Sequence, residues 1–385
     1  MLHAYAPMTD MPNNSHHQRE VRPRWRVAFG AICLGVVAIV GMVQDLALSR
    51  DEIKMSFSYD IVVESPPASL KTRRNGDDIF FKILQIPDMH YTGRPDYPCR
   101  GPPSLPCMES NMTNFIAHLL DTEKPDFVVF SGDQIEAVEV KQTADEVRKA
   151  IEAYSKEAIK RRIPWSMVFG NHDEGSTASR EQMFEQISYL PYSFSQPGLP
   201  GIGGLGNYVL EVHNASSKAT VLRLYFLDTG RSGNIAAGQK EFLLNISSSR
   251  PERDVPALLF YHIPTPDYII QPGDHIEHGH QGEEVSHGPE CGLMQTLVDM
   301  GDVKATFVGH DHFNDYCVKR KEIQLCYGGG VGFGAAYGSV SILRRARLIE
   351  YSRNATTETI STWIHSVKGT VSKDKYMLYQ HQHSN

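Results

Sequence analysis

The sequence of 385 residues predicts an α/β fold, a four-layer α/β/β/α sandwich preceded by one transmembrane helix. Apolar, β-rich runs alternate with stretches whose apolar residues recur at helical spacing, which is typical of strands buried between layers of helices. Several short β-rich runs follow one another without a helix, and they indicate that part of the sheet structure is a meander. A long uncharged run near the N-terminus predicts the transmembrane helix.

The uncharged run, VAFGAICLGVVAIVGMV, covers residues 27–43. Arg22, Arg24 and Arg26 precede it, and by the positive-inside rule they predict that residues 1–26 form a cytoplasmic tail. Because the run is longer than the ~7 to 15 apolar residues of a secretory signal, we expect an uncleaved signal anchor. The chain would then be a single-pass type II membrane protein of the secretory pathway with a lumenal or extracellular domain. The alternative is a cleaved signal peptide and secretion.

Beyond the anchor the sequence divides into three parts. Residues 44–78 form a stalk and lead-in, residues 79–352 form the main domain, and residues 353–385 form a C-terminal extension. Asn-x-Ser/Thr triplets, the acceptors of N-linked glycan, occur four times after the anchor, whereas Asn13 lies in the tail. We expect a glycoprotein whose modified triplets begin at Asn111, Asn214, Asn245 and Asn354.

Four of the cysteines form two closely spaced pairs. Cys99 and Cys107 bracket a proline-rich loop, and Cys317 and Cys326 bracket the octapeptide VKRKEIQL. These spacings favour two local disulfide bonds in an oxidising compartment, and buried free thiols are the alternative. Cys291 is left without an assigned role.

Charged residues make up 22% of the chain and give a formal net charge of −7. They are spread along the sequence rather than gathered in basic blocks, so a nucleic acid is not expected as a partner. The expected partners are a membrane, through the N-terminal helix, and the substrate of the main domain. The sequence does not indicate an oligomeric state.

Five apolar, β-rich runs are each followed at once by a loop that carries Asp, His or Asn. In open α/β sheets, the loops at the carboxyl ends of the strands gather at one edge and form the ligand site. We therefore expect these polar side chains to meet in a single site. The runs with their loops are IFFKILQIPDMH, DFVVFSGDQ, PWSMVFGNHDE, PALLFYHIP and ATFVGHDH.

The polar residues of these loops are candidate metal ligands. Their mixture of carboxylate, amide and imidazole groups suits transition metals better than Ca²⁺ or Mg²⁺, which prefer oxygen ligands alone. Seven ligands are too many for one tetrahedral ion, but two ions that share a carboxylate would use them all. We expect two divalent or mixed-valence ions of Fe, Mn or Zn. The candidate ligands are Asp88, His90, Asp133, Asn171, His262, His310 and His312.

Such a pair of ions favours phosphoryl transfer. Two metals ~3.5 to 4 Å apart clamp the attacking and leaving oxygens and lower the pKa of a shared water. Two divalent ions facing only Asp88 and Asp133 as carboxylates leave the site about two units positive, which suits a phosphate dianion. His172 directly follows Asn171 and is expected to donate a proton to the leaving alkoxide, with Asp173 orienting it. The alternative for these last two residues is a purely structural pair.

The motifs D-x-H, G-D, G-N-H-D, a later lone His and G-H-x-H occur in that order at strand ends, and they resemble the calcineurin-like metallophosphoesterase superfamily over roughly residues 80–352. The segments PDMHY, EKPDFVVFSGD, GDVKATFVGHDHFNDYC and LCYGGGVGFGAAYG more closely resemble the fungal Dcr2-type phosphatases and the small purple-acid-phosphatase-like proteins of plants. The resemblance implies two metal sites that share one carboxylate. They are Asp88, His90, Asp133 and His312, and Asp133, Asn171, His262 and His310.

The sequence departs from true purple acid phosphatases at one position. Their second motif reads G-D-x-x-Y, with the tyrosine bound to ferric iron, but here Glu136 takes that place, and His90 is expected to be the substitute ligand. We expect a hydrolase of phosphate monoesters, phosphoproteins among them, with a metal-bridging hydroxide as nucleophile and His172 as general acid. The alternatives are a phosphodiesterase of the same fold and a catalytically inactive metal-binding scaffold.

Overall fold

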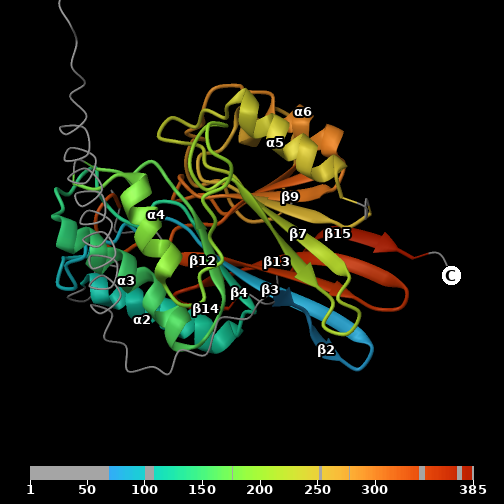
Figure 1. The fold of residues 1–385 in the computed structure, drawn as a ribbon, viewed down its shortest axis with the longest axis horizontal. Helices are drawn as coiled ribbons and strands as arrows, with labels where there is room; N and C mark the ends of the chain where they lie inside the picture. Colours follow the sequence, from blue (N-terminus) through green and yellow to red (C-terminus); the bar gives the residue numbers. More distant parts are fainter. Residues whose placement is uncertain are drawn as a thin grey trace, which may run out of the picture. The chain divides into compact units, whose positions relative to one another are not determined.

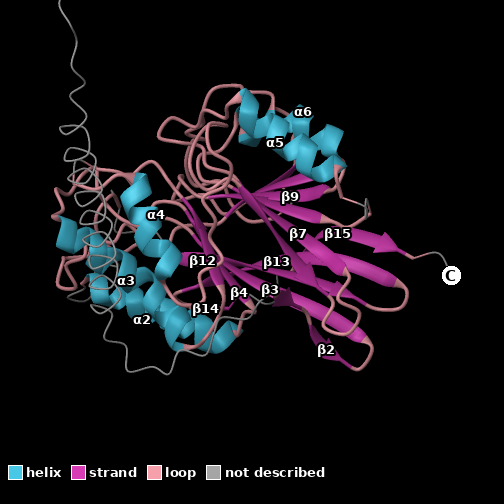
Figure 2. Ribbon diagram, in the orientation of Figure 1, coloured by secondary structure: helices cyan, strands magenta, loops and turns pink. Residues whose placement is uncertain are grey.

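The computed structural model describes residues 69–99, 108–175, 177–250, 254–276, 278–337, 343–370 and 375–383. Within these ranges the chain forms two mixed β-sheets that lie face to face, with helices on the outer faces (Figures 1 and 2). The α/β fold predicted from the sequence is confirmed. The predicted anchor at residues 27–43 lies outside the described ranges, and within them no helix has the length and apolar character needed to cross a membrane.

One sheet has seven strands in the order β1 (Leu70–Lys71), β6 (Tyr208–His213), β7 (Thr220–Phe226), β8 (Ala257–Phe260), β9 (Val303–Val308), β11 (Ile323–Tyr327) and β10 (Cys317–Arg320). Its strands β7, β8, β9 and β11 run parallel. The other sheet has eight strands, of which β15 (Tyr376–Gln382) pairs with β13 and β2 (Arg73–Asn75) pairs with β3. The remaining six have the order β14 (Gly369–Thr370), β13 (Thr357–Ser366), β12 (Arg345–Arg353), β3 (Asp78–Ile86), β4 (Phe127–Ser131) and β5 (Trp165–Val168), with β3, β4 and β5 parallel.

The helices lie on the two outer sides of the sheets (Figure 2). On the side of the eight-stranded sheet these are α2 (Glu109–Glu123), α3 (Ala144–Lys160) and α4 (Arg180–Tyr189), and on the other side α5 (Ala237–Ser248) and α6 (Leu293–Met300). A short 3₁₀ helix, η1 (Pro266–Tyr268), follows β8. α3 begins at a capping box, in which the Thr143 hydroxyl accepts a hydrogen bond from the N–H of Glu146 and the Glu146 carboxylate accepts one from the N–H of Thr143.

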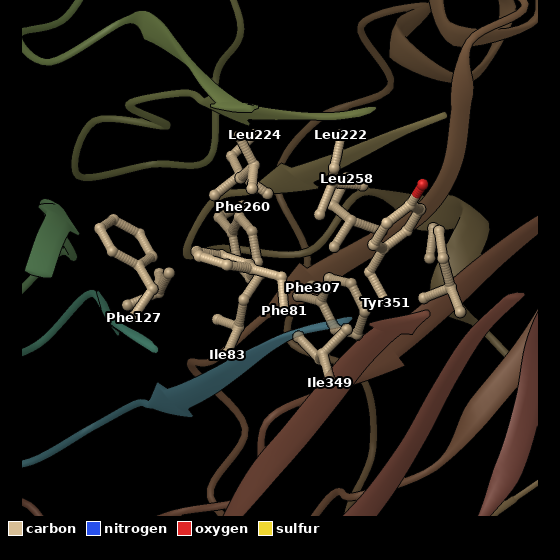
Figure 3. Close-up of a cluster of buried hydrophobic side chains, with 14 of the residues drawn as sticks. Phe81, Ile83, Phe127, Leu222, Leu224, Leu258, Phe260, Phe307, Ile349 and Tyr351 are labelled. Atoms are coloured by element: carbon tan, nitrogen blue, oxygen red, sulfur yellow. The ribbon is translucent and has the colours of Figure 1, made fainter. Parts of the chain in front are cut away.

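The main core fills the space between the two sheets (Figure 3). Part of it is a row of aromatic rings on adjacent strands of the seven-stranded sheet. Tyr208 stacks on Phe226, Phe226 on Phe260 and Phe260 on Phe307, with ring centroids 4.5, 5.6 and 5.2 Å apart. All four side chains are buried. This packing joins the four adjacent strands β6, β7, β8 and β9 on the face that lies against the other sheet.

Phe260→Ala is expected to lower the free energy of unfolding by about 3 to 5 kcal/mol, because it leaves a cavity between two stacked rings. Urea denaturation of the wild type and the variant measures the difference. Leu199→Ala is the control: Leu199 is 56% exposed, so its loss should change stability by less than about 0.5 kcal/mol. Equal stabilities of the two variants would show that the aromatic row does not support the core.

Candidate metal centre

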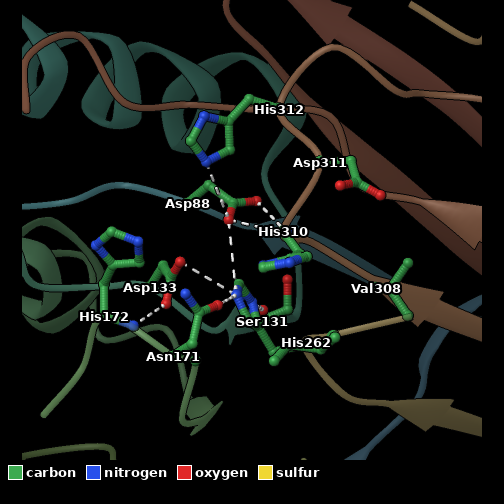
Figure 4. Close-up of polar contacts among 12 residues, drawn as sticks. Asp88, Ser131, Asp133, Asn171, His172, His262, Val308, His310, Asp311 and His312 are labelled. Atoms are coloured by element: carbon green, nitrogen blue, oxygen red, sulfur yellow. Dashed lines mark hydrogen bonds and ion pairs between the residues drawn. The ribbon is translucent and has the colours of Figure 1, made fainter. Parts of the chain in front are cut away.

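The five polar loops predicted from the sequence follow β3, β4, β5, β8 and β9, and their side chains converge on one cluster (Figure 4). Three of these strands belong to the eight-stranded sheet and two to the seven-stranded sheet. Each sheet therefore supplies one side of the cluster. The structure brings together all seven side chains that the sequence predicts as ligands, namely Asp88, His90, Asp133, Asn171, His262, His310 and His312.

The first group of candidate ligands consists of Asp88, His90 and His312, whose ligand atoms all lie within 4.8 Å of one another. The Nε2 atoms of the two imidazoles face each other at 3.2 Å. The Nε2 atom of His312 also lies 3.6 Å from Oδ1 of Asp88. Two imidazole nitrogens and a carboxylate oxygen directed at one point are the donor set of a transition-metal site.

The second group consists of Asp133, His262 and His310, again with ligand atoms within 4.8 Å. The Nε2 atom of His262 lies 3.1 Å from Oδ2 of Asp133 and 3.1 Å from Oδ1 of Asn171. The same Oδ2 atom of Asp133 lies 3.7 Å from Nε2 of His90, which belongs to the first group. Asp133 is therefore placed between the two groups, where a carboxylate that bridges two ions would lie.

The backbone of these loops adopts an uncommon conformation. Asp88, His90, Asp133 and His310 have φ values of 53°, 52°, 53° and 75°, in the left-handed region that residues with a side chain rarely occupy. Residues held in this region cluster at functional sites, where the surrounding structure maintains the strain. Four of the seven candidate ligands share this conformation, which supports the interpretation that they belong to a functional site.

Close packing around Asp133 explains a glycine in the third loop. A Cβ atom at Gly170 would lie 2.1 Å from Oδ1 of Asp133 and 2.3 Å from its backbone nitrogen, so any other residue would displace the ligand. Oδ1 also accepts a hydrogen bond of 2.8 Å from the N–H of His172. The carboxylate of Asp133 is thus fixed by the loop that carries Asn171 and His172.

The charge balance of the cluster suits bound cations. Burial, together with the charge of Asp133, raises the pKa of Asp88 to about 7, against the opposing charges of His262 and His90. Burial would lower the pKa of His262, but the negative charges of Asp133 and Asp88 outweigh it and raise this pKa to about 9. Asp88 and His262 therefore hold protons more strongly than usual, and divalent ions would displace these protons on binding. The residues present fit a pair of transition-metal ions.

Glu136 has a role that the sequence did not reveal. Its buried carboxylate lies 2.9 Å from Nδ1 of His90 and 2.8 Å from Nδ1 of His172, so both rings can donate to it. Although burial opposes ionisation, the hydrogen bonds from these two histidines lower the pKa of Glu136 to about 2. The side chain at the position of the purple enzymes' tyrosine therefore orients one candidate ligand and the candidate acid. The only signal in the sequence was its spacing of three residues from Asp133.

The carboxylate of Asp173 does not orient His172, contrary to the interpretation of the sequence. Its Oδ1 accepts a hydrogen bond of 2.9 Å from the N–H of Ile135, and its Oδ2 accepts one of 2.7 Å from the N–H of Gly170. The carboxylate thus joins the loop after β4 to the loop after β5 through their backbone N–H groups. Glu136, and not Asp173, contacts the His172 ring.

The predicted disulfide between Cys317 and Cys326 is present and joins β10 to β11. Cys107 lies outside the described residues, so its pairing with Cys99 stays a prediction, and Cys291 is a half-buried free thiol.

The predicted glycan acceptors are all accessible at least in part. Asn111, Asn245 and Asn354 are exposed and Asn214 is half-buried.

Comparisons with known proteins agree with the ligand motifs. The profile of the family described as calcineurin-like phosphoesterase matches residues 81–314. Probable inactive purple acid phosphatase 29 of Arabidopsis thaliana is 34% identical, over 77% of this chain and 85% of that protein. Phosphatase DCR2 of Saccharomyces cerevisiae is 33% identical, over 74% of this chain and 54% of that protein.

A solved structure, a dimetal phosphatase from Danio rerio, aligns over 77% of this chain and 98% of its own, with 14% identity and a TM-score of 0.49. The family profile covers more than half of the chain, and the plant relative matches across most of its own length. The resemblance inferred from the ordered motifs is confirmed. The chain belongs to the calcineurin-like phosphoesterase family.

Proposed function

We propose that this protein is a metal-dependent phosphatase that hydrolyses phosphate monoesters. The observation that carries the proposal is the position of Asp133 between two groups of candidate ligands, next to a histidine held by a buried carboxylate. Some relatives are named probable inactive phosphatases, so a scaffold without turnover is the competing function. The complete ligand set of this chain favours an active enzyme.

The residues of the centre have different roles in the proposed reaction. When bound, two divalent ions would polarise the phosphoryl group and activate a water for attack. Asp88 and Asp133 are the two carboxylates among the candidate ligands, and the proton that His172 carries as general acid offsets the charge of the ionised Glu136 beside it. Two divalent ions would therefore leave a positive surplus for a phosphate dianion. The Nδ1 atom of His172 is engaged by Glu136, and its other ring nitrogen is available to protonate the leaving oxygen. The His172 side chain is 18% exposed, so a substrate can reach it.

Turnover of p-nitrophenyl phosphate and of bis-p-nitrophenyl phosphate tests the proposal. Metal-loaded protein is expected to hydrolyse the monoester with the higher kcat/KM, because the positive surplus favours a dianion over a monoanionic diester. A preference for the diester would instead support the phosphodiesterase alternative. No turnover of either ester, with both metals bound, would support the inactive scaffold.

The replacement of the tyrosine ligand by Glu136 leads to a prediction about colour and metal identity. The purple enzymes absorb visible light because a tyrosinate donates charge to ferric iron, so this protein should show no strong band in that region. Chelation should abolish activity, and more than one of Mn²⁺, Fe²⁺ and Zn²⁺ should restore it, since imidazole and carboxylate ligands do not select strongly among them. Visible absorption and metal reconstitution provide the measurements.

His90→Ala tests the ligand assignment in the same experiment. We expect it to remove one metal and most of the activity, because His90 faces His312 in the first group. Full activity of this variant, or an intense tyrosinate band in the wild type, would contradict the assignment.

We also propose that the phosphatase domain faces the lumen or the cell exterior, held by the uncleaved anchor at residues 27–43. The arginines before the run, the accessible Asn-x-Ser/Thr triplets and the bond between Cys317 and Cys326 support this orientation. Secretion after cleavage of the signal is the alternative.

In a eukaryotic host, glycan is expected on one or more of the four acceptors that follow the anchor and none on Asn13. Peptide mapping before and after glycosidase treatment identifies the modified sites. Protease protection of the domain in sealed microsomes gives an independent measurement. Glycan on Asn13, or a domain that the protease digests in intact microsomes, would reverse the proposed topology.

A further inference from the structure

The glycine-rich segment Gly328–Tyr337 lies between β11 and β12 and has no part in the proposed reaction. Its backbone forms hydrogen bonds with the loop after β3, which carries Asp88. The N–H of Val331 donates to the carbonyl of Pro87 at 3.3 Å, and the N–H of Gly332 donates to the carbonyl of Asp88 at 2.9 Å. The segment is thus attached to the loop that carries Asp88.

Tyr337 ends this segment and contacts three candidate ligands. Its ring stacks on the imidazole of His312, with centroids 4.2 Å apart and planes 20° apart, and meets His90 edge to face at 5.8 Å. Its hydroxyl donates a hydrogen bond of 2.6 Å to the carbonyl of Asp88 and accepts one of 2.9 Å from Gly332. One buried side chain therefore touches every member of the first ligand group.

The glycine at position 332 makes this approach possible. A Cβ atom there would lie 2.2 Å from the ring of Tyr337 and 2.7 Å from the carbonyl oxygen of Asp88. Any larger residue would push the tyrosine away from the metal loop. A Cβ atom at Gly330 would likewise lie 2.7 Å from the hydroxyl of Tyr337, so the packing of Tyr337 against the ligands explains both Gly330 and Gly332.

The histidines among the candidate ligands are held in different ways. The Nδ1 atom of His90 bonds to Glu136, and that of His262 donates to the carbonyl of Ser131 at 3.0 Å. Such outer contacts fix the ring orientation of metal-bound histidines. Among the residues that the structure describes, none forms a hydrogen bond with Nδ1 of His312, and the stacked ring of Tyr337 takes the place of one.

We propose that Tyr337 is a positioning residue for one of the two metal sites, the one built from Asp88, His90 and His312. Its ring sets the plane of the His312 imidazole, and its hydroxyl holds the backbone of Asp88 in place. The group of Asp133, His262 and His310 does not depend on it. The inference rests on the two-metal assignment of the proposed function but not on the phosphatase reaction.

Metal binding to Tyr337 variants tests the inference without an activity measurement. Tyr337→Leu removes both the ring and the hydroxyl, and it should weaken one Mn²⁺ or Zn²⁺ site by about 10 to 100-fold while the other keeps its affinity. Tyr337→Phe keeps the stacked ring, so it should weaken the same site by less than about 10-fold. Competition with a chromophoric chelator and elemental analysis after dialysis measure the two affinities and the stoichiometry.

Tyr208 provides a matched control. Its ring stacks on Phe226 at 4.5 Å, and its hydroxyl donates a hydrogen bond of 2.7 Å to the carbonyl of Met167, but it lies in the core between the sheets. Tyr208→Phe and Tyr208→Leu should leave both metal affinities at the wild-type values.

Wild-type affinity at both sites in Tyr337→Leu, or equal weakening of the two sites, would overturn the inference. If Tyr337→Leu does not fold, the comparison of Tyr337→Phe with Tyr208→Phe tests the inference. Tyr337→Phe should then bind one of the two ions more weakly than Tyr208→Phe does, and the same metal affinities in these two variants would overturn the inference. Wild-type protein that binds fewer than two ions would overturn the metal assignment, and this inference with it. Two ions bound without hydrolysis of any phosphate ester would remove only the proposed function.

Discussion

His172→Ala is expected to reduce the turnover of phosphate monoesters by about 10² to 10⁴-fold, the usual contribution of a positioned general acid. Both metals should stay bound, because His172 is not among the candidate ligands and meets the centre only beside them. Its ring contacts Glu136 and the edge of His90, and its backbone N–H donates to Asp133. A series of aryl phosphates measures the effect on kcat. Esters with acidic leaving groups should lose least, since their departing oxygen needs little protonation.

The exposed His287, which hydrogen-bonds the carbonyl of Gly288, is the control for this variant. His287→Ala should keep turnover close to the wild-type value across the whole series. The proposed role of His172 would be contradicted by equal losses for all leaving groups. Loss of a metal ion from His172→Ala would contradict it as well.

Asp133→Asn is expected to lower the turnover of phosphate monoesters by more than about 100-fold. Substitution of a residue that only supports a metal ligand already lowers metal affinity or activity by about 10 to 100-fold, and Asp133 is itself a candidate ligand. The substitution should also release at least one of the two ions. The variant replaces a carboxylate whose Oδ2 faces both groups by a neutral amide of the same shape. Elemental analysis after dialysis and turnover of p-nitrophenyl phosphate measure the two effects.

Asp311 offers a control in the same cluster, since it lies between the ligands His310 and His312 in the sequence. Its carboxylate turns away from them (Figure 4) and accepts hydrogen bonds from the hydroxyl of Tyr327 at 2.6 Å and the N–H of Ser286 at 3.2 Å. Asp311→Asn should therefore keep both metals. Retention of two ions by Asp133→Asn would show that Asp133 does not bridge them.

The five metal loops could be predicted because each combines two local signals. In β4, for example, FVVFS is buried at every residue and Gly132 and Asp133 follow at once. Alternation of such runs with helices makes the strands parallel, and parallel strands bring their carboxyl ends to one edge. The ligand set followed from these signals without knowledge of any long-range contact.

The contacts that support the ligands could not be predicted in this way. Glu136 meets His90 across 46 positions of the chain, and Tyr337 meets Asp88 across 249. No periodicity records such distant pairs. Asp173 shows the converse error, because its place directly after His172 suggested a pair, whereas the turn directs its carboxylate toward backbone N–H groups.

The left-handed backbone at Asp88, His90, Asp133 and His310 sets the stability of the fold against the binding of metal ions. A residue with a side chain gives up about 1 to 2 kcal/mol in this conformation, whereas glycine adopts it freely. Glycine at all four positions would cost the fold less. The side chains that stand there instead are ones that can ligate a metal, so the chain gives up backbone stability at the positions that would bind the ions. Replacement of any of the four by glycine is therefore expected to relieve backbone strain and to remove a candidate ligand at the same time.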